Sequence, residues 1–168
     1  AILGSGSWAT ALAKIILSNV EEINWYIRKQ ETIDEFIENR RNPNHLEWAY
    51  FDTTKIYFST NINEVIDLSD TIVLAIPSPY VKACLDEISI DISHKKIISA
   101  VKGMIPDENI LITDYLHNHY GIPEEQLGII AGPCHAEEIA LERLSYLTIG
   151  CTDINQAKTW SELFANKY

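Results

Sequence analysis

The sequence predicts an α/β fold in which helices cover both faces of a mostly parallel sheet, and three observations support that prediction. Short apolar segments alternate with longer amphipathic ones along the chain, as expected for strands that alternate with helices. A glycine-rich turn at residues 4–9, Gly-Ser-Gly-Ser-Trp-Ala, links the first apolar segment to a helical one. Glycine, proline, lysine and arginine recur directly after the apolar segments. Together these features indicate a doubly wound sheet of the Rossmann type, which binds ligands at the carboxyl ends of its strands.

The strands are predicted from continuous apolar runs, which are typical of strands buried on both faces of a parallel sheet. In chain order the expected strands are Ala1–Leu3, Ile23–Ile27, Lys55–Phe58, Thr71–Ile76, Lys96–Ala100, Leu127–Ala131 and Leu144–Ile149. A strand usually has about 5–6 residues. The short first run therefore suggests a strand truncated at its start, in a piece of a longer protein.

The helices are predicted from apolar residues that recur at helical spacing. Ser78 and Pro79 suit the N-cap and the first position of the helix after the fourth strand. Asn42-Pro43-Asn44 breaks the pattern and is followed by an expected loop over His45–Thr54. In chain order the expected helices are Ser7–Asn19, Thr32–Arg40, Ile62–Leu68, Ser78–Ile88, Asn109–Tyr120, Cys134–Glu142 and Ile154–Lys167.

Composition is that of an ordinary globular protein and argues against several functional classes. The chain has 168 residues, 46% of them hydrophobic, which fits one domain over residues 1–168. Its 13 basic and 24 acidic residues give a net charge of −11, which argues against a nucleic-acid partner because a phosphate backbone requires a basic face. No apolar run approaches the ~18–20 residues of a membrane span, and no signal-peptide pattern appears.

Cysteine and histidine spacing favours a reducing compartment and gives no metal-binding pattern. The cysteines at 84, 134 and 151 are odd in number and far apart, which suits the cytoplasm better than a disulfide framework or a zinc site. His117 and His119 are two residues apart in a helical segment, whereas ligands on one helical face need a spacing of three or four. We therefore expect a cytoplasmic protein without a bound metal.

The glycine-rich turn predicts a site for a dinucleotide. Gly4 permits a tight turn after the strand, Gly6 lets a diphosphate approach the backbone, and Ala9 keeps the helix close to the sheet. Free N–H groups at the start of the helix carry partial positive charge, which favours phosphates. Trp8 is expected to point toward the rim of the cofactor. A plain tight turn is the alternative interpretation, but the strand before the turn and the helix after it favour cofactor binding.

The end of the second strand predicts a preference for NADP. Sheets that bind NAD usually carry Asp or Glu at this point to hold the ribose hydroxyls. Here Ile27 is followed by Arg28, Lys29 and Gln30, and no acid appears before Glu31. Two cations can hold a 2′-phosphate, so we expect NAD(P) as the cofactor, with NADP preferred. A solvent-exposed basic turn is the alternative.

Three later strand ends supply further candidates. Pro77 follows the fourth strand and joins the cofactor-binding set. Lys102 follows the fifth, where an ammonium can hydrogen-bond a carbonyl oxygen and balance charge near a nicotinamide; a surface lysine is the alternative. The turn at residues 132–136, Gly-Pro-Cys-His-Ala, offers N–H groups to a substrate oxygen. Adjacent residues at a helix start point about 100° apart, so we expect no covalent catalysis by Cys134 with His135.

The order and spacing of these motifs resemble the bacterial NAD(P)-dependent glycerol-3-phosphate dehydrogenases over the whole chain. The residues that carry the resemblance are Gly4, Gly6, Ser7 and Trp8 running into Ala9-Thr10-Ala11-Leu12-Ala13, then Asn42-Pro43-Asn44-His45-Leu46, Ile76-Pro77-Ser78, Val101-Lys102-Gly103, and Gly132-Pro133 with Ala136 and Glu138. The chain departs from the family pattern at Ala9, which replaces a glycine, at Cys134, which replaces a hydroxyl residue, and at His135, which replaces an aromatic one. The last two departures concern the detail of substrate contact.

The resemblance implies an oxidoreductase that reduces dihydroxyacetone phosphate to sn-glycerol 3-phosphate, which feeds phospholipid synthesis. A homodimer of the full-length protein is compatible with it. The implied roles are nucleotide contact for Ser7, Trp8 and Arg28, cofactor contact for Ala136, substrate contact for Gly132 and Cys134, and contact with both for the catalytic Lys102.

The family's enzymes also have a C-terminal helical domain that carries the proton-donating lysine and the groups that clamp the substrate phosphate. That domain is absent from this chain, so we expect residues 1–168 to bind the nucleotide and to turn over poorly or not at all. Two alternatives stay open. One is another two-domain dehydrogenase, of the 6-phosphogluconate or ketopantoate type, and the other is a non-catalytic nucleotide-sensing module.

Overall fold

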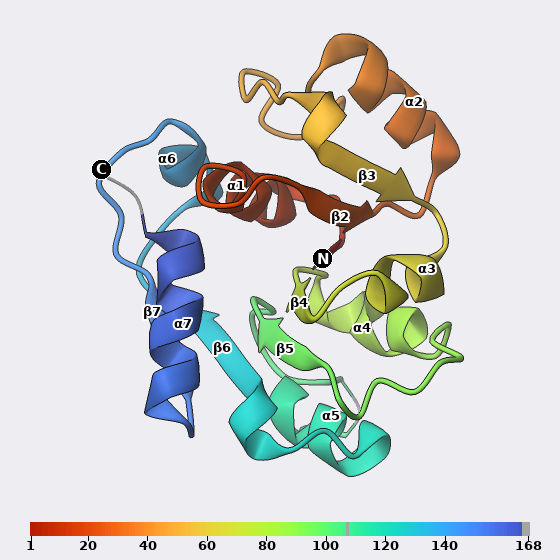
Figure 1. The fold of residues 1–168 in the computed structure, drawn as a ribbon, viewed down its shortest axis with the longest axis vertical. Helices are drawn as coiled ribbons and strands as arrows, with labels where there is room; N and C mark the ends of the chain where they lie inside the picture. The colour runs from red at the N-terminus through yellow and green to blue at the C-terminus, as the bar shows by residue number, and fades with distance from the viewer. Residues whose placement is uncertain (107, 166–168) are drawn as a thin grey trace.

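The structure is a computed structural model that describes residues 1–106 and 108–165. In this part of the chain a seven-stranded sheet has the order β3-β2-β1-β4-β5-β6-β7 (Figure 1). The strands are β1 Ile2–Leu3, β2 Ile23–Tyr26, β3 Ile56–Ser59, β4 Thr71–Leu74, β5 Lys96–Ser99, β6 Leu127–Ala131 and β7 Thr148–Cys151. The helices are α1 Ser7–Ile16, α2 Gln30–Asn39, α3 Ile62–Asp67, α4 Ser78–Leu85, α5 Ile112–Tyr120, α6 Ala136–Ala140 and α7 Ile154–Phe164, with 3-10 helices η1 Thr53–Lys55 and η2 Glu124–Gln126.

Strand β1 lies between β2 and β4 and pairs parallel with both of them. Ile2 is in register with Trp25 on one side and with Val73 on the other. The chain runs outward from β1 to β3 and then returns to β4, so the connections after β1 and β4 leave in opposite directions. Such a reversal opens a crevice at the carboxyl ends of the two strands. The predicted doubly wound, mostly parallel sheet is confirmed; among the strands of the described residues, β7 alone pairs antiparallel, with β6.

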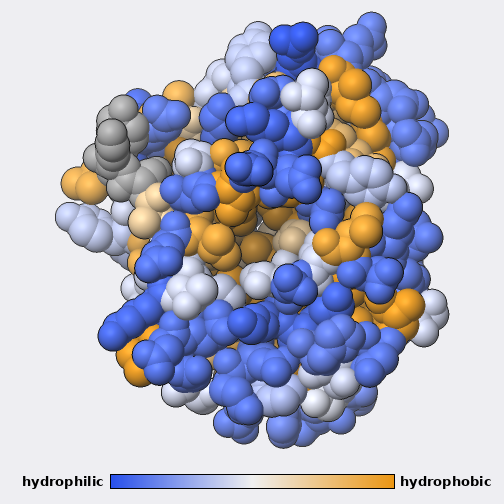
Figure 2. Space-filling model, in the orientation of Figure 1, coloured by the Kyte–Doolittle hydropathy of each residue, from blue (hydrophilic) through white to orange (hydrophobic). Residues whose placement is uncertain are grey.

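Apolar side chains form one core on each face of the sheet. One core joins buried residues of α1, α2, α6 and α7 to the sheet, and the other joins those of α3, α4 and α5. On the outside, apolar side chains gather toward the centre of the face shown in Figure 2, and hydrophilic ones dominate its periphery. The two cores hold the strand ends in place from both sides.

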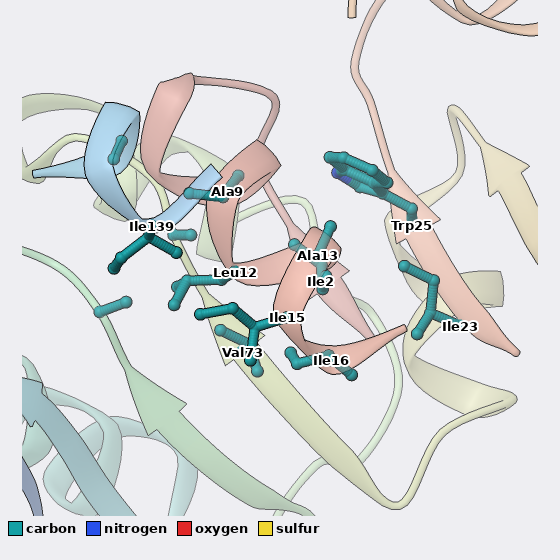
Figure 3. Packing of buried hydrophobic residues seen from close by; sticks show 14 of the residues in the cluster. Ile2, Ala9, Leu12, Ala13, Ile15, Ile16, Ile23, Trp25, Val73 and Ile139 are labelled. Carbon is teal, nitrogen blue, oxygen red and sulfur yellow. The ribbon is translucent and has the colours of Figure 1, made fainter. Parts of the chain in front are cut away.

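Helix α1 is the element that carries the glycine-rich turn, and packing fixes its position. Its buried face is built from small and branched side chains, including Ala9, Leu12 and Ala13. Figure 3 shows these residues against Ile2 of β1 and Ile139 of α6. Small residues let the helix lie close to the sheet, so the turn before it sits directly over the end of β1.

Several predicted boundaries were wrong. A strand was expected at Leu144–Ile149, but β7 begins at Thr148; Leu144 and Tyr146 are exposed, and Gly150 fits the strand because a Cβ there would press on Ile129. The sixth predicted helix, Cys134–Glu142, is shorter and forms only as α6.

Further deviations lie at the starts and ends of helices. The helix expected from Asn109 begins at Ile112, because Asn109 has a left-handed backbone (φ 54°) and closes a turn in which Ile105 bonds with Ile110. The expected N-cap Ser78 is instead the first residue of α4, after an N-cap at Pro77. The last helix, expected to reach Lys167, extends to Phe164, and residues 166–168 lie outside the described residues.

Candidate functional site

The two glycines of the turn after β1 have different surroundings. Gly4 has φ +118°, and a Cβ placed on it would overlap the carbonyl oxygen of Ala75, just beyond β4. Only glycine satisfies both the backbone angle and the close approach of the two strand ends. A Cβ on Gly6 would meet no atom within 4 Å. The space over Gly6 is therefore open to a ligand, as a diphosphate that approaches the backbone requires.

The start of α1 faces this open space without a side-chain cap. Gly6 is the N-cap residue, and as a glycine it has no side chain that could cap the helix. No acidic residue lies in the first turn. The first helical bond runs from the N–H of Thr10 to the carbonyl of Gly6 at 3.0 Å, so the earlier N–H groups of the helix have no partner within it. Uncapped N–H groups and the helix dipole together suit an anion.

A loop distant in sequence holds the turn in this shape. The fully buried Asn42 donates from Nδ2 to the carbonyl of Ser5 at 2.9 Å and to Oγ1 of Thr10 at 2.8 Å. Its Oδ1 accepts from the N–H of Asn44 at 3.0 Å. The hydroxyl of Ser7 shares a hydrogen bond of 3.2 Å with Nδ1 of His45. The Asn-Pro-Asn break was predicted as a loop start, but its support of the glycine turn was not.

A cavity of about 400 Å³ lies on the β2 side of the turn. It brings together four of the predicted cofactor-binding residues: Gly4, Gly6, Arg28 and Pro77. The lining residues that the sequence did not single out as site residues are Tyr26, His45, Tyr80, Cys84 and Glu87, together with Ser5, Ile76 and Ala83. We name it the Arg28 cavity.

The wall of the Arg28 cavity carries one cation and one acid. The hydroxyl of Tyr26 donates to Oε2 of Glu87 at 3.1 Å. Burial raises the pKa of Tyr26, and the nearby Cys84 and Glu87 act in the same direction. Burial, reinforced by Glu87, raises the pKa of the Cys84 thiol to about 12. The phenol and the thiol therefore stay neutral near pH 7, and Arg28 and Glu87 supply the charge.

A second cavity, of about 460 Å³, lies on the β5–β6 side and is lined by three predicted site residues, Trp8, Lys102 and Gly132. We name it the Lys102 cavity. The ammonium of Lys102 lies 5.2 Å from the centroid of the Trp8 ring. The other lining residues are Ser99, Val101, Gly103, Leu111, Ile112, Thr113, Ile129, Ile130 and Ala131. The cavity thus presents one cation in a largely apolar wall.

The remaining predicted residues lie close by but outside both linings. Ser7 is tied to His45, as described above. Cys134 and Ala136 are buried in the core that packs around α1. The Cys134 thiol lies 3.7 Å from the carbonyl of Gly132, and burial raises its pKa against the opposing effect of Lys102. A protonated, buried thiol is a poor nucleophile.

Within residues 1–106 and 108–165, no cluster of three His, Cys, Asp or Glu side chains could hold a metal ion. Nδ1 of His117 is 2.8 Å from the carbonyl of Ile122, and His119 stacks on Tyr115. The three cysteines are free. In the same part of the chain, every helix is too short or too polar to cross a bilayer.

The family model and the curated relatives point to the same family. Residues 1–157 match a family model described as the N-terminus of NAD-dependent glycerol-3-phosphate dehydrogenase. A curated relative from Exiguobacterium, named glycerol-3-phosphate dehydrogenase (NAD(P)+), is 28% identical over 99% of this chain and 49% of its own length. The chain spans about half the length of the curated relatives it matches.

Solved structures agree with this match. Glycerol-3-phosphate dehydrogenase of Plasmodium falciparum superposes with a TM-score of 0.86 and 29% identity, over 99% of this chain and 49% of that one. The enzyme of Coxiella burnetii superposes with a TM-score of 0.85 over 99% of this chain and 50% of that one, and its 20% identity supports the fold alone.

Proposed function

Because this chain belongs to the family of NAD-dependent glycerol-3-phosphate dehydrogenase N-terminal domains, we propose that it binds NAD(P) across the end of β1 and serves the reduction of dihydroxyacetone phosphate to sn-glycerol 3-phosphate. One observation carries the proposal most directly. An uncapped helix N-terminus opens onto free space over Gly6, between two cavities. That arrangement fits a dinucleotide, whose diphosphate links two separate halves.

The chain's own residues divide the work of binding. The N–H groups at the start of α1 hold the diphosphate, with Gly4, Gly6 and Ser7 shaping the turn. Arg28 and Pro77 line the cavity proposed for the adenosine half. Trp8 and Lys102 line the cavity proposed for the nicotinamide half and the substrate, with Gly132 at its edge. At this edge Cys134, whose thiol lies 3.7 Å from the Gly132 carbonyl, would contact the substrate, and Ala136 would lie against the coenzyme.

The chemistry follows from charge. The bound coenzyme would supply the hydride that reduces the ketone carbon. Negative charge then develops on the ketone oxygen, and the ammonium of Lys102 can stabilise it in the apolar surroundings of its cavity. The relatives are about twice as long as this chain. We therefore propose that residues 1–168 form the coenzyme-binding domain, and that the proton donor and the phosphate clamp come from the region matching the relatives' second half.

We further propose that NADP is preferred over NAD. Arg28 is exposed at the end of β2 and lines the adenosine cavity, where it can meet a 2′-phosphate. Glu87 lines the same cavity, but one of its oxygens already accepts from Tyr26.

Free thiols are consistent with a reducing, cytoplasmic location, which is part of the proposal. We also propose that the full-length protein is a homodimer.

The test uses the full-length protein that contains residues 1–168. Loss of NADPH absorbance is followed with dihydroxyacetone phosphate and with ketopantoate, and NADP reduction is followed with 6-phosphogluconate. Turnover with dihydroxyacetone phosphate alone is expected. Turnover with another member of the panel would move the chain to a different dehydrogenase type. Tight NADPH binding without any turnover would support the nucleotide-sensing alternative, which the family match does not favour.

A further inference from the structure

Lys102 differs from the other lysines that lie over aromatic rings. Lys14 lies over Phe51 and also donates to a backbone carbonyl, and Lys82 lies over Tyr115 and also pairs with a carboxylate. Among the residues that the structure describes, the Lys102 ammonium makes no hydrogen bond or salt bridge; its recorded contact is with the Trp8 ring, 5.2 Å from the centroid. The charge of Lys102 is therefore held near an aromatic ring without being neutralised.

The Trp8 ring is also held by packing against the core. Trp8 is the second residue of α1, directly after the turn, and it packs against the core that surrounds this helix. Its indole Nε1 is buried and has no hydrogen-bond partner among the described residues. A buried indole N–H without a partner is costly. Packing of the ring therefore outweighs this cost and places the aromatic surface beside Lys102.

We propose that Trp8 is a positioning residue for Lys102, an inference that rests on the function proposed above. A carboxylate partner would also hold the ammonium, but it would cancel the charge that the ketone oxygen needs. An aromatic face attracts a cation through its quadrupole and leaves the net charge intact. Trp8 thus keeps Lys102 at the cavity wall with its full charge available to the substrate.

This role is distinct from a contact between Trp8 and the coenzyme. A coenzyme contact alone predicts that replacing Trp8 weakens coenzyme binding whether or not Lys102 is present. Positioning predicts that the effect on the substrate step disappears once Lys102 has been removed. The two roles are therefore separable by combining the two substitutions.

The first test reads the contact directly in this chain, without coenzyme or substrate. Lysines are dimethylated with 13C, which preserves their charge, and the Lys102 signal is identified by its loss in Lys102→Arg. The ring current of Trp8 is expected to shift this signal upfield. Trp8→Phe should retain part of the shift and Trp8→Leu should abolish it. The Lys14 and Lys82 signals, which lie over other rings, should not move and report that the variant is folded.

The matched control is Trp48→Leu, which removes an exposed tryptophan that lines neither cavity. It should leave the Lys102 signal unchanged. A Lys102 signal that is the same in the wild-type chain and in Trp8→Leu would overturn the proposal. So would a signal that moves equally in Trp48→Leu. If Trp8→Leu does not fold, Trp8→Phe decides alone, because the smaller ring must give a smaller shift.

The second test is a kinetic cycle in the full-length protein with Trp8→Leu, Lys102→Met and the double variant. Trp8→Leu should lower kcat/KM for dihydroxyacetone phosphate by about two- to thirtyfold, the range that cation–π attraction supplies from exposed to desolvated sites. Trp8→Phe should recover part of this loss. In the Lys102→Met background, Trp8→Leu should have little further effect on kcat/KM at saturating coenzyme. Losses that simply multiply would overturn the positioning role.

The two tests fail in different ways. If the wild-type protein does not reduce dihydroxyacetone phosphate, the proposed function is wrong, and the NMR shift still shows whether Trp8 holds Lys102. If the protein is active but the shift is absent, the function stands and the positioning inference falls.

Discussion

Gly4 and Gly6 belong to the same turn, but they are glycines for different reasons. At Gly4 the reason is internal, because the left-handed backbone and the Ala75 carbonyl leave no room for a side chain. At Gly6, apart from its chain neighbours, no atom of the described residues lies within 4 Å of a Cβ. If the proposed diphosphate site is correct, the constraint at Gly6 comes from the ligand, and substitutions at the two positions should separate folding from binding.

We expect Gly4→Ala to lower the free energy of unfolding by about 2–4 kcal/mol, from backbone strain and steric overlap. Gly6→Ala should change it by less than about 1 kcal/mol, since the extended N-cap backbone of Gly6 suits any residue. Its NADPH affinity should nevertheless fall roughly tenfold or more, because the methyl group occupies the space over the helix start. Urea unfolding and calorimetry measure the two quantities. Unchanged NADPH affinity in Gly6→Ala would contradict the proposed diphosphate position.

Arg28 offers a test of coenzyme preference at a single side chain. Arg28→Gln should lower NADPH affinity by about 10- to 100-fold, the value of a charge-assisted hydrogen bond. NADH affinity should hardly change, because NADH has no 2′-phosphate. Lys29→Gln is the matched control, since Lys29 is a neighbouring exposed cation that does not line the cavity. Equal losses for both coenzymes, or for both variants, would argue against a 2′-phosphate contact.

At the scale of elements, the loop after α2 supports the turn before α1. Asn42 links the two through hydrogen bonds to Ser5 and Thr10, and it is completely buried. Buried polar groups that lose their partners are costly, so the contact contributes to both stability and the shape of the turn. The turn geometry is thus a property of two elements that lie about forty residues apart in the sequence.

Asn42→Ala should lower the free energy of unfolding by about 1–3 kcal/mol, because the Ser5 carbonyl and the Thr10 hydroxyl oxygen both lose their buried donor, and the Thr10 hydroxyl keeps only its own bond to the Gly6 carbonyl. Coenzyme affinity should fall as well, since the turn loses its support. Asn39→Ala, which removes an exposed asparagine bonded only to the helix backbone, should cost less than about 0.5 kcal/mol and leave binding unchanged. Denaturant titration with and without NADPH gives both values. Similar behaviour of the two variants would show that Asn42 does not brace the turn.

For the molecule as a whole, buried phenols and thiols make the free energy of unfolding pH-dependent in the alkaline range. Burial raises the pKa of Cys84 from 9.0 to about 12, and burial likewise raises the pKa of Tyr120 from 10.0 to about 12. In the unfolded chain these groups lose their protons at lower pH than in the folded one. Between about pH 9 and 12 the unfolded state therefore binds fewer protons, and the free energy of unfolding must fall as pH rises.

We expect this fall in urea unfolding experiments at increasing pH, with little change between pH 7 and 8 from these groups. Cys84→Ala removes one of the titrating groups and should reduce the slope above pH 9. Cys151→Ala, which removes a thiol outside the Arg28 cavity, is the matched control. Equal slopes in the wild type and in Cys84→Ala would show that the Cys84 thiol ionises as readily in the folded chain as in the unfolded one.

The sheet, its seven strands and the helices between them were predictable because they depend on local patterns. Apolar runs such as Thr71–Leu74, and the glycine turn, can be recognised from a few consecutive residues. Boundaries failed where a single backbone angle or a neighbour decided them. Because Asn109 has a left-handed backbone, α5 begins at Ile112 and not at Asn109. Pairing with β6 places the start of β7 four residues after its expected start.

The order of elements and the chemistry at their ends could be read from the chain alone, because periodicity and turn composition are properties of neighbouring residues. The composition of each cavity could not. Folding brings segments that are far apart in the sequence to one edge of the sheet. As a result, Tyr80 and Glu87 line the same cavity as Arg28. Asn42 bonds to the glycine turn, and Lys102 lies over the Trp8 ring. Sheet order and loop packing determine these contacts, and long-range contacts leave no periodic signal in the sequence.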